Sequence, residues 1–180
     1  MIKKLTPEEF ARDWAPIRDR LTDGKTFLHP DWRPVPIPLF LSQGMGPPCW
    51  RVREDPEVVD EFTPLRRTLA ELGIQEICCG PAAGSAWDAY LLPPTEDATA
   101  GINQVSHPHG EWVCWFSREG SWCLLQREQW FSVLGGTPQF MEAYLHQAGG
   151  MDAVRKRFED FDVSQAWEPS WDRSWADWRE

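Results

Sequence analysis

The chain has 180 residues and a formal net charge of −10, and 42% of its residues are hydrophobic. This length and composition suit one folded domain and exclude a wholly disordered chain. The negative charge disfavours nucleic acid as a partner, because phosphates would be repelled, and the absence of any stretch of about eighteen apolar residues argues against a membrane partner.

The N-terminal stretch "LTPEEFARDWAPIRDRL" carries a strong helix-start signal. Thr6 suits the N-cap, Pro7 suits the first helical position, and Glu9 completes a capping box. Apolar residues then recur at helical spacing on one face: Phe10, Trp14, Ile17 and Leu21. The sequence predicts one helix that continues to Leu21.

Residues 27–48 form an arm rich in proline, as in "HPDWRPVPIPLF". Proline fixes φ and removes a backbone donor, so we expect extended or edge conformation, with "IPLFLS" as an edge strand. One interpretation is a ligand for a proline-recognising module. We favour the other, an arm held on the domain by its aromatic residues: Trp32, Phe40 and Trp50.

The Thr-Pro opening of the first helix returns twice more along the chain. "TPLRRTLAELG" predicts a helix that begins at Thr63-Pro64 and ends at Gly73, and "TPQFMEAYLHQAGG" predicts one that begins at Thr137 and ends at Gly149-Gly150. Between these helices "IQEICCG" and "SAWDAYLLP" predict strands, and "PPTEDATAGINQVSHPHG" is a long polar loop of the kind that often carries function.

The strongest strand signal lies at residues 111–126, where a Glu119-Gly120 turn separates two apolar runs. If Arg118 pairs with Ser121, one face of this hairpin carries Trp112, Cys114, Phe116, Cys123 and Leu125. The other face carries Val113, Trp115, Trp122 and Leu124. Because both faces are apolar, we expect the hairpin to lie centrally in its sheet and to be covered on both sides. "WFSVLGG" predicts a third strand.

These elements predict an α+β fold, with a central antiparallel or mixed sheet that contains the 111–126 hairpin and is flanked by several helices. We expect residues 1–163 to form a single domain, with the proline-rich arm at 27–48. Residues 164–180 would then form a tryptophan-rich C-terminal helix docked on that domain.

Chemistry-bearing residues are few, and no motif for a phosphate, dinucleotide or hydrolase site occurs. Cys79 precedes Gly-Pro at a strand end, where a nucleophile is one interpretation and a buried structural thiol the favoured one. His107 and His109 lie in the polar loop near Glu96, Asp97 and Glu111, which suggests either a metal shell or, as we favour, a polar binding surface. We therefore expect no catalytic residue, bound metal or cofactor.

The C-terminal "WEPSWDRSWADWRE" places tryptophans at helical spacing on one face: Trp167, Trp171, Trp175 and Trp178. The stripe either covers a groove on its own domain, which we favour, or docks on a basic partner as a set of binding hot spots. In either case the polar face of this helix presents Asp172 and Asp177 to a partner.

The run "WVCWFSREGSWCLLQREQWFSVLGGTPQFMEAYL" resembles small bacterial immunity proteins, in which a tryptophan-bearing strand pair leads to an LGG-type turn and then a helix. The resemblance covers about a fifth of the chain and implies a cytoplasmic protein that neutralises a cognate toxin by binding it. An odd number of cysteines, five, also favours a reducing compartment. The expected partner is a basic protein. The alternative is a small enzyme, or a small-molecule or metal-binding protein, that uses the Cys79 or His107/His109 region.

Overall fold

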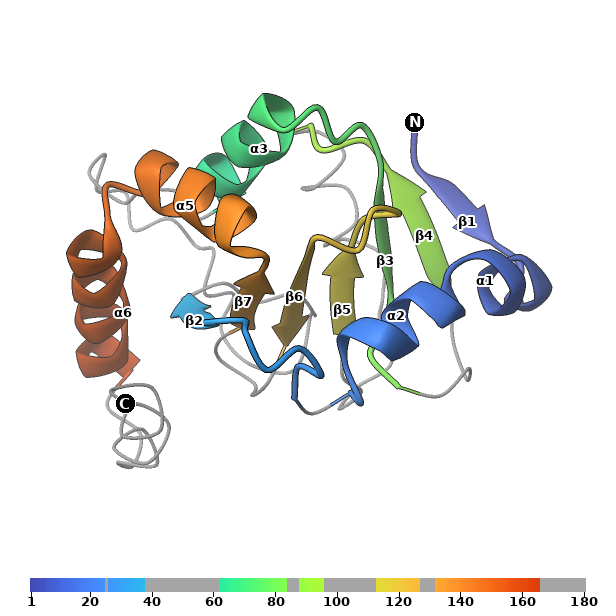
Figure 1. The fold of residues 1–180 in the computed structure, drawn as a ribbon, viewed down its shortest axis with the longest axis horizontal. Coiled ribbons are helices and arrows are strands. Elements are labelled where there is room, and N and C mark those ends of the chain that lie inside the picture. Colours follow the sequence, from blue (N-terminus) through green and yellow to red (C-terminus); the bar gives the residue numbers. More distant parts are fainter. Residues whose placement is uncertain (25, 38–61, 84–87, 96–112, 127–131, 166–180) are drawn as a thin grey trace.

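The computed structural model describes residues 1–24, 26–37, 62–83, 88–95, 113–126 and 132–165. Their strands form one seven-stranded sheet in the order β1-β4-β3-β5-β6-β7-β2, and every neighbouring pair is antiparallel. Helices flank this sheet, which confirms the predicted α+β fold and the antiparallel form of its sheet (Figure 1).

The strands are short and follow one another closely in the second half of the chain. Their bounds are β1 Lys3–Leu5, β2 Val35–Ile37, β3 Ile77–Pro81, β4 Ala89–Leu92, β5 Val113–Phe116, β6 Trp122–Gln126 and β7 Ser132–Gly136. The helices are α1 Pro7–Asp13, α2 Ala15–Leu21, α3 Phe62–Glu71, α5 Pro138–Gln147 and α6 Met151–Gln165.

The β5–β6 hairpin lies in the middle of the sheet with the predicted register. Trp115 pairs with Leu124 and Phe116 pairs with Cys123, which is the alignment set by an Arg118–Ser121 pair. Side chains of alternate residues enter two separate hydrophobic clusters, one on each face of the sheet. The prediction of a central hairpin covered on both sides is therefore confirmed for the strands that the structure describes.

Aromatic pairs join the helices to the two faces of this hairpin. On one face the Trp14 ring meets Phe116 edge-on, with centroids 6.0 Å apart. On the other face Phe62 of α3 lies 5.1 Å from Trp115, and Phe140 of α5 stacks on Trp122 at 5.5 Å. Helices α1 and α2 thus cover one side of the sheet, while α3 and α5 cover the other (Figure 1).

The prediction of one continuous N-terminal helix was wrong, because the chain turns at Trp14. Trp14 ends α1 and begins α2 with φ −124° and ψ −39°. The cause is Pro16, which has no N–H to donate to an earlier carbonyl and whose ring crowds the preceding turn. The predicted apolar face survives the break, since its four members lie in one cluster: Phe10, Trp14, Ile17 and Leu21.

The helix ends follow the predicted signals with one exception. The capping box of Thr6 and Glu9 is formed, and the Thr137 hydroxyl accepts the Phe140 N–H to begin α5. Gly73 has φ +70° just after α3, as a C-terminal glycine should. The exception is Thr63, which lies inside α3 rather than before it, since that helix already includes Phe62.

The sheet has two edge strands, and the sequence predicted them only in part. Strand β1 was missed, because three residues with two lysines show no apolar alternation. Strand β2 is an edge strand that contains Pro36, but it begins at Val35, earlier than the predicted "IPLFLS". The arm does pack through Trp32, which is buried, whereas Phe40 and Trp50 lie outside the described residues.

The paired glycines of "LGG" make room for aromatic rings on opposite faces of β7. A Cβ on Gly135 would lie 2.8 Å from Trp32 Cε3 and 3.0 Å from Phe27 Cε2. A Cβ on Gly136 would lie 2.7 Å from Phe140 Cδ1 and 3.0 Å from the Ser121 carbonyl oxygen. The glycines are therefore required for packing, and the motif belongs to the framework of the sheet.

We expect Gly136→Ala to lower the free energy of unfolding by about 1–3 kcal/mol, because the new methyl group overpacks the contact with Phe140. Urea unfolding monitored by tryptophan fluorescence measures this loss. In a double-mutant cycle, Phe140→Leu should reduce the cost of Gly136→Ala. Gly150→Ala is the control, since Gly150 has φ +94° but no atom within 4 Å of an added Cβ, so its cost should be independent of Phe140→Leu. Equal costs of Gly136→Ala with either residue at position 140 would contradict the steric explanation.

Candidate functional site

The nine residues predicted to bind a partner lie outside the described residues. They are Glu96, Asp97, His107, His109, Glu111, Asp172, Trp175, Asp177 and Trp178. The structure nevertheless fixes where their segments join the rest of the protein, because the flanking strands and α6 are described. These attachment points define the candidate site.

One end of the sheet, called here the loop end, is defined by five strand-end residues: Ile37, Pro81, Val113, Gln126 and Ser132. Ser132 pairs with both Ile37 and Gln126, and Val113 pairs with Pro81. Because β5 begins at Val113 and β6 ends at Gln126, this end lies opposite the Glu119-Gly120 turn (Figure 1).

Several connections join the sheet at the loop end. Residues 38–61 follow Ile37, residues 127–131 link Gln126 to Ser132, and residues 96–112 lead into Val113. Helix α6 runs beside β2 from the turn at Gly149-Gly150 toward the same side of the molecule, so residues 166–180 also join the protein there (Figure 1).

The segment that carries the predicted loop site is attached at two opposite ends of the sheet. Glu111 lies two residues before Val113 at the loop end. The chain reaches Glu96 and Asp97 from Leu92, which pairs with Ile77 at the opposite end. These two attachment points are separated by the length of β3, about 13 Å for five residues at about 3.3 Å per step. His107 and His109 are close to Val113 in sequence, and their predicted roles stay predictions.

The excess of acidic residues is concentrated in the segments outside the described residues. Thirteen of the 28 acidic residues and six of the 18 basic residues lie there, which leaves −7 of the net charge of −10 on these segments and −3 on the described residues. The structured framework is therefore close to neutral, and the field that a partner meets comes mainly from the connections.

The sequence interpretation passed over one such connection, which leads from β2 to α3. It contains five carboxylates between residues 54 and 61: Glu54, Asp55, Glu57, Asp60 and Glu61. Its first residue follows Ile37 at the loop end, whereas the five carboxylates lie at its other end in sequence, directly before Phe62 at the start of α3. The high proportion of acidic residues in this stretch is evident from the sequence, but the stretch follows the proline-rich arm and was not predicted to be a binding segment.

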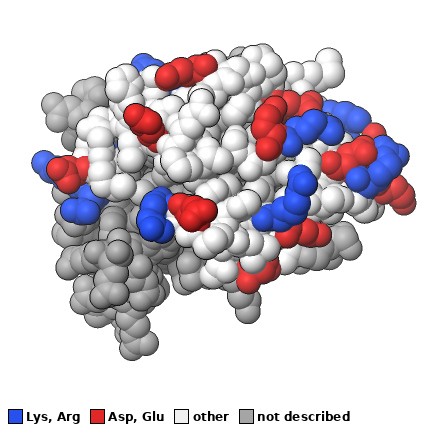
Figure 2. Space-filling view, viewed as in Figure 1, with Lys and Arg blue, Asp and Glu red and all other residues white. Residues whose placement is uncertain are grey.

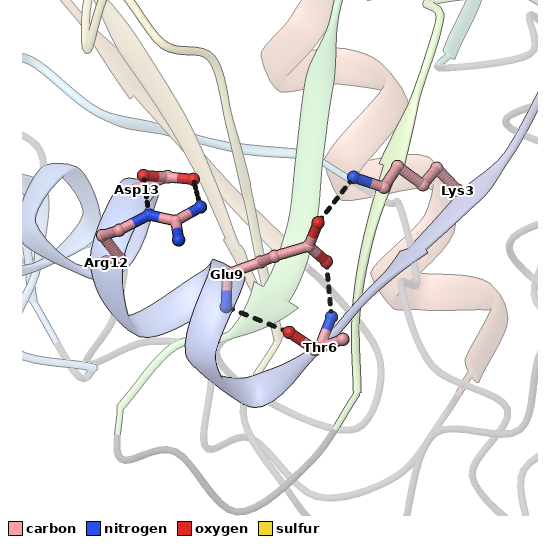
Figure 3. Close-up of polar contacts among 5 residues, drawn as sticks. All are labelled: Lys3, Thr6, Glu9, Arg12 and Asp13. Atoms are coloured by element: carbon pink, nitrogen blue, oxygen red, sulfur yellow. Dashed lines mark hydrogen bonds and ion pairs between the residues drawn. The ribbon is translucent and has the colours of Figure 1, made fainter.

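Several charges on the described surface pair with side chains of opposite sign. Lys3 Nζ lies 2.9 Å from Glu9 Oε1, and Lys4 pairs with Asp88, the residue before β4. Arg12 donates to both carboxylate oxygens of Asp13, at 2.8 and 2.7 Å (Figure 3). Acidic and basic side chains consequently alternate over the α1–α2 side of the molecule (Figure 2).

One of these charge clusters is built around the capping box of α1. The Glu9 N–H donates to Thr6 Oγ1 at 3.1 Å, and the Thr6 N–H donates to Glu9 Oε2 at 2.9 Å (Figure 3). The hydrogen bond from Lys3, followed by that from the Thr6 backbone, lowers the pKa of Glu9 below its ordinary 4.5. This carboxylate therefore stabilises the helix start and is already engaged within the protein.

Cys79 lies in β3, in the interior of the hydrophobic cluster that α3 and α5 cover. Its exposed fraction is 0%, and burial raises the pKa of its thiol well above the ordinary 9.0. A nucleophilic cysteine needs a lowered pKa and access to substrate. The environment of Cys79 is thus that of a structural residue, and its neighbour Cys78 faces the opposite cluster, as predicted for adjacent strand residues.

Other searches of the described residues give no site. No group of three or more His, Cys, Asp or Glu side chains among them is arranged to hold a metal ion. None of the helices in this part of the chain is both long and apolar enough to cross a bilayer. Comparison of the chain with protein-family models, curated proteins and solved structures gives no match. The resemblance to immunity proteins therefore stays a prediction.

We expect the thiols of Cys78, Cys79 and Cys123 to react with iodoacetamide much more slowly in the native protein than in denaturant. All three are fully buried, and burial raises the pKa of each, so little thiolate forms. Timed alkylation followed by peptide mass spectrometry measures each rate, and the same protein in urea is the control. Native labelling of Cys79 at the rate of an exposed cysteine would revive a nucleophilic role.

The pH dependence of stability should contain a contribution from the Lys3–Glu9 pair. Because the folded-state pKa of Glu9 is lowered, its stabilising effect is complete above the ordinary 4.5 and is lost as the pH falls through the lowered value. A double-mutant cycle with Lys3→Gln and Glu9→Gln, measured by urea unfolding, should give a coupling at neutral pH that disappears in acid. Glutamine still accepts the Thr6 N–H, so the cycle isolates the charge. A coupling that stays constant from neutral to strongly acidic pH would contradict this explanation.

Proposed function

We propose that this protein is a non-catalytic, cytoplasmic binding protein that neutralises a basic toxin by direct contact through its loop end. The observation that supports the proposal is the separation of charge between framework and connections. Most of the net negative charge lies on segments outside the described residues, and several of these segments join one end of a nearly neutral sheet.

Electrostatics favours a basic partner for such an arrangement. Acidic connections, several of which attach to the framework at the loop end, accelerate encounter with a positively charged surface and reject like-charged competitors. The same field repels nucleic acid, so an immunity role would block a basic nuclease or another basic enzyme without competing for its substrate.

The framework supports binding by connections rather than by the sheet itself. Both faces of the β5–β6 hairpin are covered by helices, so neither face is free to receive a partner there. A rigid, doubly covered sheet that carries long connections is a common way to hold binding residues. The resemblance to immunity proteins is compatible with binding through the connections. The LGG turn that carries the resemblance contains Gly135 and Gly136, which serve packing within the framework.

We expect a variant with Glu111→Gln, Glu128→Gln and Asp172→Asn to bind the basic partner at least tenfold more weakly and with a weaker dependence on salt. These residues lie on connections that join the sheet or α6 at the loop end. The partner is first captured by crosslinking and mass spectrometry in its own cells, beginning with the product of the adjacent gene. Titration calorimetry then measures its affinity.

The matched control removes three exposed carboxylates from the described framework: Glu76→Gln, Glu119→Gln and Glu142→Gln. Glu76 and Glu119 lie near the end of the sheet opposite the loop end. Both variants change the net charge equally, so a general charge effect would weaken binding equally. Equal losses, or failure of the chain to protect cells that express the candidate toxin, would overturn the proposal.

The tryptophan stripe and the acidic face of the C-terminal segment should have separable roles. We expect Trp175→Ala to lower the free energy of unfolding by about 3 kcal/mol while partner affinity is retained, because a tryptophan docked on its own domain is part of the core. Asp177→Asn is the control and should leave stability unchanged. Thermal unfolding and calorimetry measure the two effects. Unchanged stability with lost affinity in Trp175→Ala would instead make the stripe a docking surface.

A further inference from the structure

We draw no further inference here: the strongest candidate, the row of thiols of Cys78, Cys114 and Cys123 on the face of the sheet beneath α1 and α2, is fully buried within the hydrophobic core and forms no metal-holding group with other described residues.

Discussion

The constraint on which the rest of the structure depends is the apolar character of both faces of the β5–β6 hairpin. A strand pair with large side chains on each face is unstable unless each face is covered, because every exposed aromatic ring would forfeit its burial energy. Trp115 and Trp122 are fully buried on one side, and Phe116 is fully buried on the other. Helices are therefore needed on both sides of the sheet, with α1 and α2 on one side and α3 and α5 on the other.

This central position also explains the smallest residues of the sheet. Strand β7 lies next to β6, where rings approach from both directions, so it can carry no side chain at Gly135 or Gly136. The rings of Trp32 and Phe140 occupy the space that two Cβ atoms would take. Close packing of this kind fixes the distance of the helices from the sheet and leaves the framework little freedom to change shape.

A framework sealed in this way leaves neither face of the central hairpin exposed. Some polar groups near the sheet form contacts within the framework. The buried Arg18 donates a hydrogen bond to the Pro81 carbonyl oxygen at 3.2 Å, and its guanidinium group lies over the Phe10 ring. Arg118 similarly stacks on Trp14, with 4.5 Å between its guanidinium carbon and the ring centroid. Basic residues thus support the α1–α2 layer, while the excess of acidic over basic residues lies mainly in the connections.

Local sequence determined those elements whose signals are local in physical origin. A capping box, a positive-φ glycine and strict alternation about a two-residue turn each act within a few residues, and Thr6, Gly73 and the hairpin register were accordingly predicted. Pro16 carried an equally local signal against a continuous helix, but the apolar periodicity through Trp14 outweighed it in the prediction. The α+β class followed from the order of these elements.

Tertiary structure alone decided the strand order, the edge strand β1 and the shared position of distant connections. Lys3 and Lys4 join the sheet because β4 offers an open edge, a condition that no pattern within residues 3–5 expresses. Likewise Ile37, Val113 and Gln126 are far apart in sequence, and only antiparallel pairing brings them to one end. It also separates the two points where the segment that contains Glu96 and Glu111 joins the sheet, because Leu92 and Val113 pair with opposite ends of β3. Pairing between distant strands depends on the whole chain, and the geometry of the candidate site depends on that pairing.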